Sequence, residues 1–260
     1  MQWTAEENRW VEVFQTLKSY QLFAFDNIAT ASQYWIAYEH FLKSVTVPGA
    51  RVLDWGCGSG HFSYFLLNNG FKTESFNVNA GDSYHPDGIK IADLLTTRFK
   101  DAFNFKISSG DPVKLPYPDE SFDAVVSVGV LEHVRQEGGD EIKSLKEIRR
   151  ILKKGGVFLC FHFPNKYSWV EAVARQIPSK HHHLYRFTKK NILDLNEAAG
   201  LNVETVQAYA VLPRNELARL PEGIKNNPTF VKFYNRADRL LPKVLPPVFQ
   251  NYYFRSRKEG

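Results

Sequence analysis

The chain has 260 residues, of which 43% are hydrophobic, 23% charged and 14% aromatic, and its formal net charge at pH 7 is +5. This length and composition fit one large globular domain, and no apolar run approaches the roughly 18 residues of a membrane-spanning helix. The basic residues are scattered and accompany no recognised RNA-binding module, so a nucleic-acid partner is unlikely.

The first 47 residues are predicted to form an N-terminal helical cap. Thr4 and Glu7 have the spacing of a capping box, which would open a first helix. A second helical pattern covers about 29–45, and Pro48-Gly49 ends it. Aromatic residues of this second helix, Tyr34 among them, lie at helical spacing, and core packing is the favoured interpretation over a substrate cage.

From residue 48 to 260, strand and helix patterns alternate. Strands are predicted at 51–54, 73–78, 104–108, 122–128, 157–163, 201–209 and 252–254, and helices at 61–69, 89–100, 141–152 and 188–200. Such alternation predicts a Rossmann-like, doubly wound α/β domain with a mostly parallel seven-stranded sheet and helices on both faces.

Two long connections interrupt this alternation, at 164–187 and at 210–250, and the second contains six prolines. Both follow predicted strands. They are therefore expected either at the carboxyl edge of the sheet, where open α/β sheets bind ligands, or at the periphery.

The two cysteines, Cys57 and Cys160, lie in separate apolar runs without metal-binding or disulfide spacing. The first residues include Glu6 and Glu7, where a signal peptide would be basic. A reducing, cytoplasmic location is the simplest expectation.

The most informative stretch is the sequence DWGCGSG at 54–60, which follows an apolar strand and precedes a helix. Glycines at alternate positions allow a sharp turn and a close approach of a ligand to the backbone. The spacing differs from the GxGxxG of phosphate-binding dinucleotide sites, and an acid before the loop suits a ligand with an ammonium group better than one with a pyrophosphate. A nicotinamide-dependent dehydrogenase is therefore disfavoured.

Further along, the chain reads GDPVKLPYPDESFDAVVS at 110–127 and then VLEHV at 130–134. Together with the glycine loop, and in this order and spacing, these segments resemble the class I S-adenosylmethionine-dependent methyltransferases. The resemblance is to the small-molecule methyltransferases of ubiquinone- and menaquinone-type pathways, and it covers about residues 50–160.

The resemblance implies S-adenosyl-L-methionine as cofactor and assigns residues to it. Gly56, Gly58 and Gly60 would pack under the methionine moiety, with Asp54 near its ammonium. In the same way Asp111 would accept a hydrogen bond from the adenine amino group, and the backbone near Val128 would contact the methionine part; a simple turn role is the alternative for Asp111.

One departure from the family pattern concerns the end of the second strand, where an acid is expected to bind the ribose hydroxyls. That position is Asn77, with Asn79 and Asp82 nearby. An amide oxygen can accept the same hydrogen bond without charge assistance. The departure also leaves open a methyltransferase-like binding protein without catalysis.

Glu132 and His133 are the candidate catalytic pair, and His133 is chemically suited to accept a proton from a hydroxyl because its usual pKa lies near neutrality. A structural role, with both residues tied to the backbone at a helix start, is the alternative. In some related enzymes a Glu three residues earlier completes a metal site with such a pair. That position is Gly129 here, so no metal is expected.

Other histidines are weaker candidates. The run at 181–183 could suggest a metal, but three consecutive histidines cannot all face one ion on a regular element, and no spaced partner is evident. His183 is expected to be a pocket or packing residue, and His162, near the carboxyl end of a strand, faces either substrate or core.

The function predicted from these observations is methyl transfer to a small-molecule acceptor, most simply to oxygen. The alternatives are a non-catalytic binding protein and an RNA methyltransferase. Base amino-group methylation is disfavoured because the fourth strand leads into Ser127-Val128-Gly129-Val130 and not into an Asp/Asn-Pro-Pro-Tyr-like motif.

Overall fold

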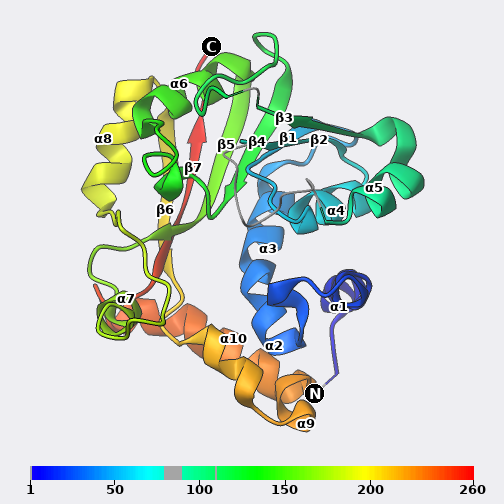
Figure 1. Cartoon of the computed structure of the whole chain (residues 1–260), viewed down its shortest axis with the longest axis vertical. Helices are drawn as coiled ribbons and strands as arrows, with labels where there is room; N and C mark the ends of the chain where they lie inside the picture. The colour runs from blue at the N-terminus through cyan, green and yellow to red at the C-terminus, as the bar shows by residue number, and fades with distance from the viewer. Residues whose placement is uncertain (1, 79–89, 109) are drawn as a thin grey trace.

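A seven-stranded sheet forms the centre of the molecule (Figure 1). The computed structural model describes residues 2–78, 90–108 and 110–260. The strands are β1 (Arg51–Trp55), β2 (Lys72–Asn77), β3 (Phe103–Ile107), β4 (Phe122–Val128), β5 (Leu152–Pro164), β6 (Asn202–Tyr209) and β7 (Asn251–Arg257). Their order is β3-β2-β1-β4-β5-β7-β6, with β7 antiparallel to both neighbours and the other pairs parallel. The predicted mostly parallel seven-stranded sheet is confirmed.

Helices cover both faces of the sheet, as predicted. The helices α4 (His61–Asn68) and α5 (Ala92–Phe99) lie on one side, and α6 (Glu141–Ile151) and α8 (Lys189–Ala199) on the other (Figure 1). Successive residues of a strand point to opposite faces. The strands therefore supply two cores, one containing Val52, Val126 and Leu159 and the other Leu53, Val125 and Phe158.

Small differences from the predicted elements occur at their ends. The helix expected at 89–100 begins at Ala92, and residues 79–89 lie outside the described residues. The helix expected at 141–152 ends at Ile151, and Leu152 already begins β5.

The N-terminal helices are α1 (Ala5–Ser19), α2 (Ile28–Ala31) and α3 (Trp35–Ser44). The Thr4–Glu7 capping box opens α1 as predicted. The helix expected over 29–45 is divided by a 3-10 turn, Ser32–Tyr34. Trp35 and Tyr38 are buried in the core, in agreement with the packing interpretation.

The two long connections contain helices of their own. Residues 164–187 include α7 (Trp169–Ala174), and residues 210–250 include η5 (Arg214–Arg219), α9 (Glu222–Lys225) and α10 (Pro228–Val244). Pro228 suits α10 because it stands in the first turn, where no hydrogen-bonded N–H is needed, whereas Pro242 lies inside the helix near its C-terminal end, where its missing N–H removes one hydrogen bond.

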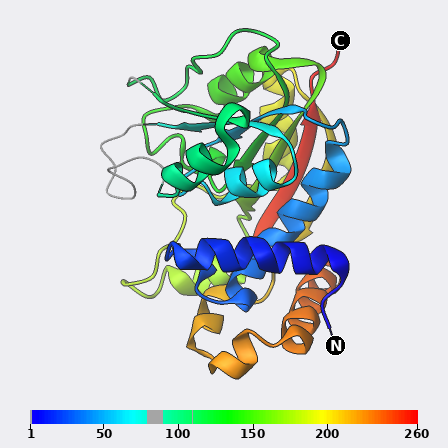
Figure 2. The ribbon, with the colours of Figure 1, turned by 90° about the vertical axis from the view of Figure 1, so that its right-hand side faces the viewer.

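These helices and the N-terminal ones gather beyond the carboxyl edge of the parallel strands (Figures 1 and 2). Ion pairs join them across the sequence. Lys232 of α10 binds Glu7 of α1 at 2.8 Å, and Arg239 of α10 binds Glu39 of α3 at 2.6 Å. No helix within the described residues has the length and apolar character needed to cross a membrane.

Candidate functional site

The glycine loop connects β1 to α4 and is fastened to the end of β2. The amides of Gly56 and Cys57 both donate to the Phe76 carbonyl, at 2.8 and 3.1 Å. Gly56, Gly58 and Gly60 have φ values of +72°, +50° and +86°, in the left-handed region that glycine enters at little cost. A sharp, backbone-exposing turn therefore stands where the sequence predicts it.

Two of these glycines face different surroundings. A Cβ atom on Gly56 would lie 2.4 Å from Cγ2 of Val130, so Val130 packs directly on the loop. A Cβ atom on Gly58 would meet no atom of the described residues within 4 Å, so the space in front of it is open with respect to them. Gly56 allows the close packing of the protein chain, and Gly58 leaves room for a ligand.

Asp54 and Asn77 lie beside this loop. Asp54 is 2% exposed, and its Oδ2 accepts a hydrogen bond from the Ser63 hydroxyl at 2.5 Å. Burial raises the pKa of Asp54 to about 7, although the Ser63 hydrogen bond opposes the shift. Asn77 ends β2, accepts from the Gly58 amide at 3.0 Å and donates to the Gly58 carbonyl at 3.4 Å. The fold thus brings the acid, the three glycines and Asn77 together, whereas Asn79 and Asp82 lie outside the described residues.

Asp111 lies in the segment that follows β3, and Val128 lies at the end of β4. Oδ1 of exposed Asp111 accepts from the amides of Val113 and Lys114 at 2.8 and 3.1 Å, and these bonds lower its pKa. The turn role foreseen as an alternative for Asp111 is therefore present, and it leaves Oδ2 without a bond in this turn. Val128 is the last residue of β4, which pairs with β1.

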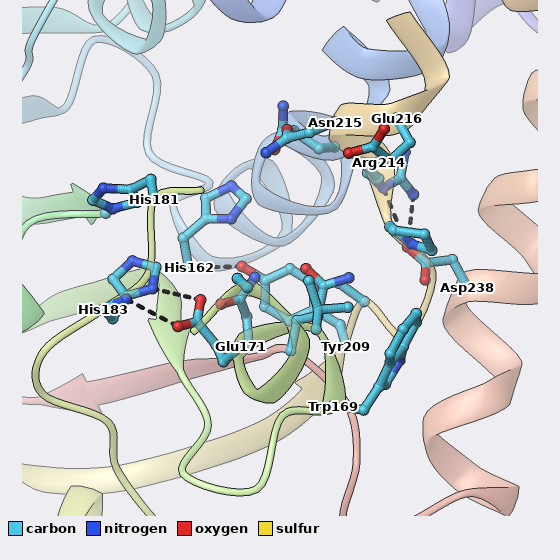
Figure 3. Close-up of a pocket in the computed structure, with 18 of the residues that line it drawn as sticks. His162, Trp169, Glu171, His181, His183, Tyr209, Arg214, Asn215, Glu216 and Asp238 are labelled. Carbon is cyan, nitrogen blue, oxygen red and sulfur yellow. Dashed lines mark hydrogen bonds and ion pairs between the residues drawn. The ribbon is translucent and has the colours of Figure 1, made fainter. Parts of the chain in front are cut away.

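A cavity of about 670 Å³ lies at the carboxyl edge of β4, β5 and β6 (Figure 3). Residues of β5 and β6, His162 and Tyr209, line it together with residues from four other parts of the chain. These are the N-terminal helices (Ser32, Gln33, Ile36), the segment after β4 (Gly129, Glu132, His133), the connection containing α7 (Trp169, Glu171, Val173, Ile177, His181, His183) and the connection containing α10 (Arg214, Asn215, Asn235, Asp238). The volume is in the range of small-molecule sites.

Glu132 and His133 stand in the 3-10 turn Leu131–His133 that follows β4, and both line the cavity. Glu132 is 1% exposed, and neither carboxylate oxygen has a hydrogen-bond partner among the described residues. Oε1 of Glu132 lies 3.8 Å from Nε2 of His133. Burial raises the pKa of Glu132 to about 7 and lowers the pKa of His133, which the neighbouring His183 lowers further.

Two further histidines point into this region (Figure 3). His162 of β5 lines the cavity, its amide donates to the Tyr209 hydroxyl at 2.6 Å, and its φ is +60°. Burial lowers the pKa of His162 to about 3. His183 also lines the cavity, where Nδ1 contacts Oε1 of Glu171 at 2.8 Å.

Part of the cavity lining was not predicted from the sequence. Asp238 of α10, 3% exposed, accepts from the amides of Val211 and Leu212 and from Arg214, whose Nη2 lies 2.9 Å away. Arg214 also reaches Ser32 Oγ at 3.0 Å. No local pattern marks these residues, and only the proline-rich segment from 210 to 250 indicated where they lie.

Residues 53–160 match the family described as the methyltransferase domain. Over 200 residues the chain is 26% identical to the ubiquinone biosynthesis O-methyltransferase of Xanthomonas campestris pv. campestris, covering 74% of this chain and 79% of that protein. Over 131 residues it is 34% identical to the 2-methyl-6-phytyl-1,4-hydroquinone methyltransferase of Synechocystis sp., covering 50% of this chain and 36% of that protein.

The fold is also found among solved structures. The 1,6-didemethyltoxoflavin-N1-methyltransferase of Burkholderia thailandensis, solved with S-adenosylhomocysteine bound, covers 100% of this chain and 92% of its own at a TM-score of 0.56 and 17% identity. The domain match, the related sequences and this fold agree with the glycine loop at the end of β1. Residues 53–160 therefore match a methyltransferase domain, and the chain has the fold of this solved methyltransferase.

Proposed function

We propose that the chain binds S-adenosyl-L-methionine at its glycine loop and transfers the methyl group to an oxygen atom of a small molecule held in the cavity. The observation that carries this proposal is the position of the segment after β4. Val130 packs on Gly56 of the loop, and its neighbours Gly129 and Glu132 line the cavity. One short segment thus contacts the loop on one side and the cavity on the other, as methyl transfer between two adjacent ligands requires.

In this proposal the cofactor residues are those that the resemblance implies: Asp54, Gly56, Gly58, Gly60, Asn77, Asp111 and Val128. The open space in front of Gly58 would take the methionine part. Oδ2 of Asp111 remains available to accept from an adenine amino group, because both turn bonds use Oδ1. Asp54 is buried under the loop, so its carboxylate would act on a ligand ammonium across a short, poorly screened distance.

The chemistry is an in-line displacement. A lone pair of the acceptor oxygen forms the new bond to the methyl carbon while the carbon–sulfur bond breaks and its electron pair stays on sulfur. S-Adenosylhomocysteine leaves as a neutral thioether, and the hydroxyl proton passes to the Glu132–His133 pair. Because the carboxylate of Glu132 makes no hydrogen bond within the described protein, it is free to accept a hydrogen bond from the hydroxyl of a small molecule bound in the cavity.

The names of two relatives refer to ubiquinone biosynthesis and to a hydroquinone, and the cavity carries apolar walls from Ile36, Trp169 and Val173. Both features favour a ring-containing small molecule over RNA. The buried free cysteines, Cys57 and Cys160, agree with the proposed reducing cytoplasmic compartment.

Calorimetric titration separates the candidate functions. The protein should bind S-adenosylhomocysteine and not NADH. It should also release S-adenosylhomocysteine from S-adenosylmethionine when offered a panel of phenols and hydroquinones. Glu132→Gln should lower that turnover by roughly 10²- to 10⁴-fold, the usual contribution of a positioned base, with unchanged S-adenosylhomocysteine affinity. Binding without turnover by any acceptor would favour the non-catalytic alternative, and absence of binding would refute the proposal.

A further inference from the structure

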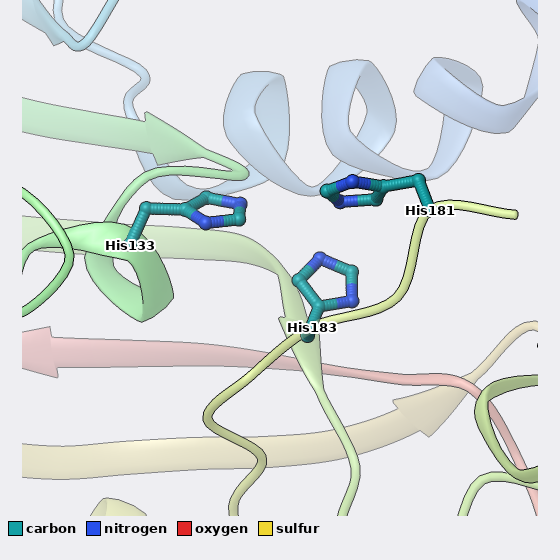
Figure 4. Close-up of side chains that lie close together, drawn as sticks. All are labelled: His133, His181 and His183. Atoms are coloured by element: carbon teal, nitrogen blue, oxygen red, sulfur yellow. The ribbon is translucent and has the colours of Figure 1, made fainter. Parts of the chain in front are cut away.

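Three histidine rings converge at the edge of the cavity (Figure 4). They belong to His133, after β4, and to His181 and His183, in the connection after α7. One nitrogen from each ring lies within 4.8 Å of the other two. In the sequence the run at 181–183 has no evident partner, so no metal is predicted there, but the fold places His133 beside two of its rings.

The run belongs to no helix or strand, and it brings two of its rings together, those of His181 and His183, whose centroids lie 5.4 Å apart. His182, between them, turns elsewhere, and its Nδ1 lies 3.4 Å from the Lys180 carbonyl. The objection that three consecutive histidines cannot face one ion therefore does not apply, since only His181 and His183 take part.

Neighbouring groups orient two of the rings. Oε1 of Glu171 lies 2.8 Å from Nδ1 of His183, and Oε2 of Glu171 accepts the His183 amide at 2.9 Å. A carboxylate on one ring nitrogen leaves Nε2 as the free donor atom, which is the usual arrangement behind a metal-bound histidine. Nδ1 of His133 lies 3.4 Å from Oε1 of Gln136, which gives that ring a weaker support of the same kind.

A second observation points to a cation at this place. The carboxylate of Glu132 is buried beside His133 with neither oxygen hydrogen bonded in the described structure. A buried carboxylate without a partner is costly, and a divalent ion held by the adjacent imidazoles would compensate it. His181 is exposed and the cluster opens on the cavity, so an ion has a path to reach it.

We propose that His133, His181 and His183 form a binding site for one divalent transition-metal ion of the zinc type, with Glu171 as the residue that orients His183. Imidazole nitrogens favour zinc, nickel, iron and copper over magnesium and calcium, which prefer oxygen ligands. Nitrogens 2.0–2.1 Å from a tetrahedral ion would stand about 3.4 Å apart, so the rings need to close by about 1 Å on binding.

The three imidazoles would leave at least one coordination position open toward the cavity. A His133 ring nitrogen bound to the metal could not accept a proton. Glu132 would then take the hydroxyl proton in the proposed methyl transfer. Metal binding itself does not require methyl transfer, so the two proposals can fail separately.

The test uses the full chain without an added histidine tag, stripped with a chelator and titrated with ZnCl₂ against a chromophoric competitor. We expect one zinc ion per chain, no displacement by millimolar magnesium, and an absorption band from tetrahedral cobalt when Co²⁺ is used instead. His181→Ala and His183→Ala should each weaken zinc binding at least tenfold, and Glu171→Gln by about 10- to 100-fold. The matched control is His182→Ala, which should bind zinc like the unaltered chain.

S-Adenosylhomocysteine titration of each variant shows whether the fold and the cofactor site are intact. Loss of zinc with retained S-adenosylhomocysteine binding supports the site. Absence of stoichiometric zinc binding by the unaltered chain would overturn the proposal. An equal loss of zinc affinity in His182→Ala and His181→Ala would also overturn the proposal, because the histidine run at 181–183 alone would then account for zinc binding.

Discussion

Gly58 offers a direct test of the cofactor site, because it can be compared with a glycine of similar conformation elsewhere. Gly58 has φ +50° and Gly49, in the turn before β1, has φ +66°, and a Cβ atom on either would meet nothing within 4 Å. Gly49 lies outside the loop, and none of the residues proposed to bind the cofactor adjoins it. Valine at either position thus carries a similar backbone cost without a clash in the protein.

The two variants should lose similar stability and differ in binding. The left-handed conformation costs an ordinary residue about 1–2 kcal/mol, so each of Gly58→Val and Gly49→Val should lose at least that much free energy of unfolding. In Gly58→Val the side chain would also occupy the open space that we assign to the methionine part. We expect S-adenosylhomocysteine affinity to fall at least about 100-fold there, equivalent to about 2.7 kcal/mol, and to remain unchanged in Gly49→Val.

Urea unfolding measures the free energy of unfolding, and calorimetry measures the S-adenosylhomocysteine affinity of the same preparations. Wild-type affinity in folded Gly58→Val would refute the assignment of the loop as the cofactor site. A comparable loss in Gly49→Val would show that backbone strain, and not occupation of the ligand space, is responsible.

Two further predictions concern residues beside the loop. Burial raises the pKa of Asp54 to about 7, against about 3.9 in an unfolded chain, so this group costs stability progressively as the pH rises from about 4 to 7. Asp54→Asn, which stays neutral, should gain stability relative to wild type as the pH rises from 5 to 8, by at most about 3 kcal/mol. A difference in free energy of unfolding that stays constant across this range, measured by urea unfolding of both proteins, would contradict the reasoning. Asn77→Asp should tighten S-adenosylhomocysteine binding, because a charged acceptor makes the stronger hydrogen bond to the ribose, by roughly fivefold at most. The gain should be reduced because aspartate cannot donate to the Gly58 carbonyl, 3.4 Å from Nδ2 of Asn77, and weaker binding by calorimetry would mean that Asn77 mainly holds the loop.

The central sheet could be predicted from the sequence because its signals are local. The strand at 122–128 agrees residue for residue with β4, since an apolar run buried on both faces has definite ends. The Thr188 cap and Gly200 likewise place α8 within a residue, and Gly200 has the left-handed conformation expected after a helix. Each of these signals depends on a few adjacent residues and on backbone chemistry alone.

The substrate side could not be predicted to the same degree, for two physical reasons. Residues 210–250 appeared irregular because of their prolines, yet α10 includes two of them: Pro228 stands in its first turn, where no N–H is needed, and Pro242 lies inside it near the C-terminal end. The orientation of α10 depends on partners distant in sequence, such as Glu7 for Lys232 and Glu39 for Arg239, and no local pattern encodes these pairs.

The histidine cluster shows why site residues are the hardest to identify. His133 and His183 are 50 residues apart and come to neighbouring positions only because β4 and β5 are adjacent parallel strands whose following segments meet at one edge. Residues at such an edge contact a ligand from irregular backbone and have no period of 2 or 3.6. In this chain the sheet topology decides which residues meet at the edge, and the chemistry of the side chains found there decides what they can bind. A prediction of the topology, which the sequence supports, therefore directs the search for site residues first to the segments that follow the strands β1 to β6.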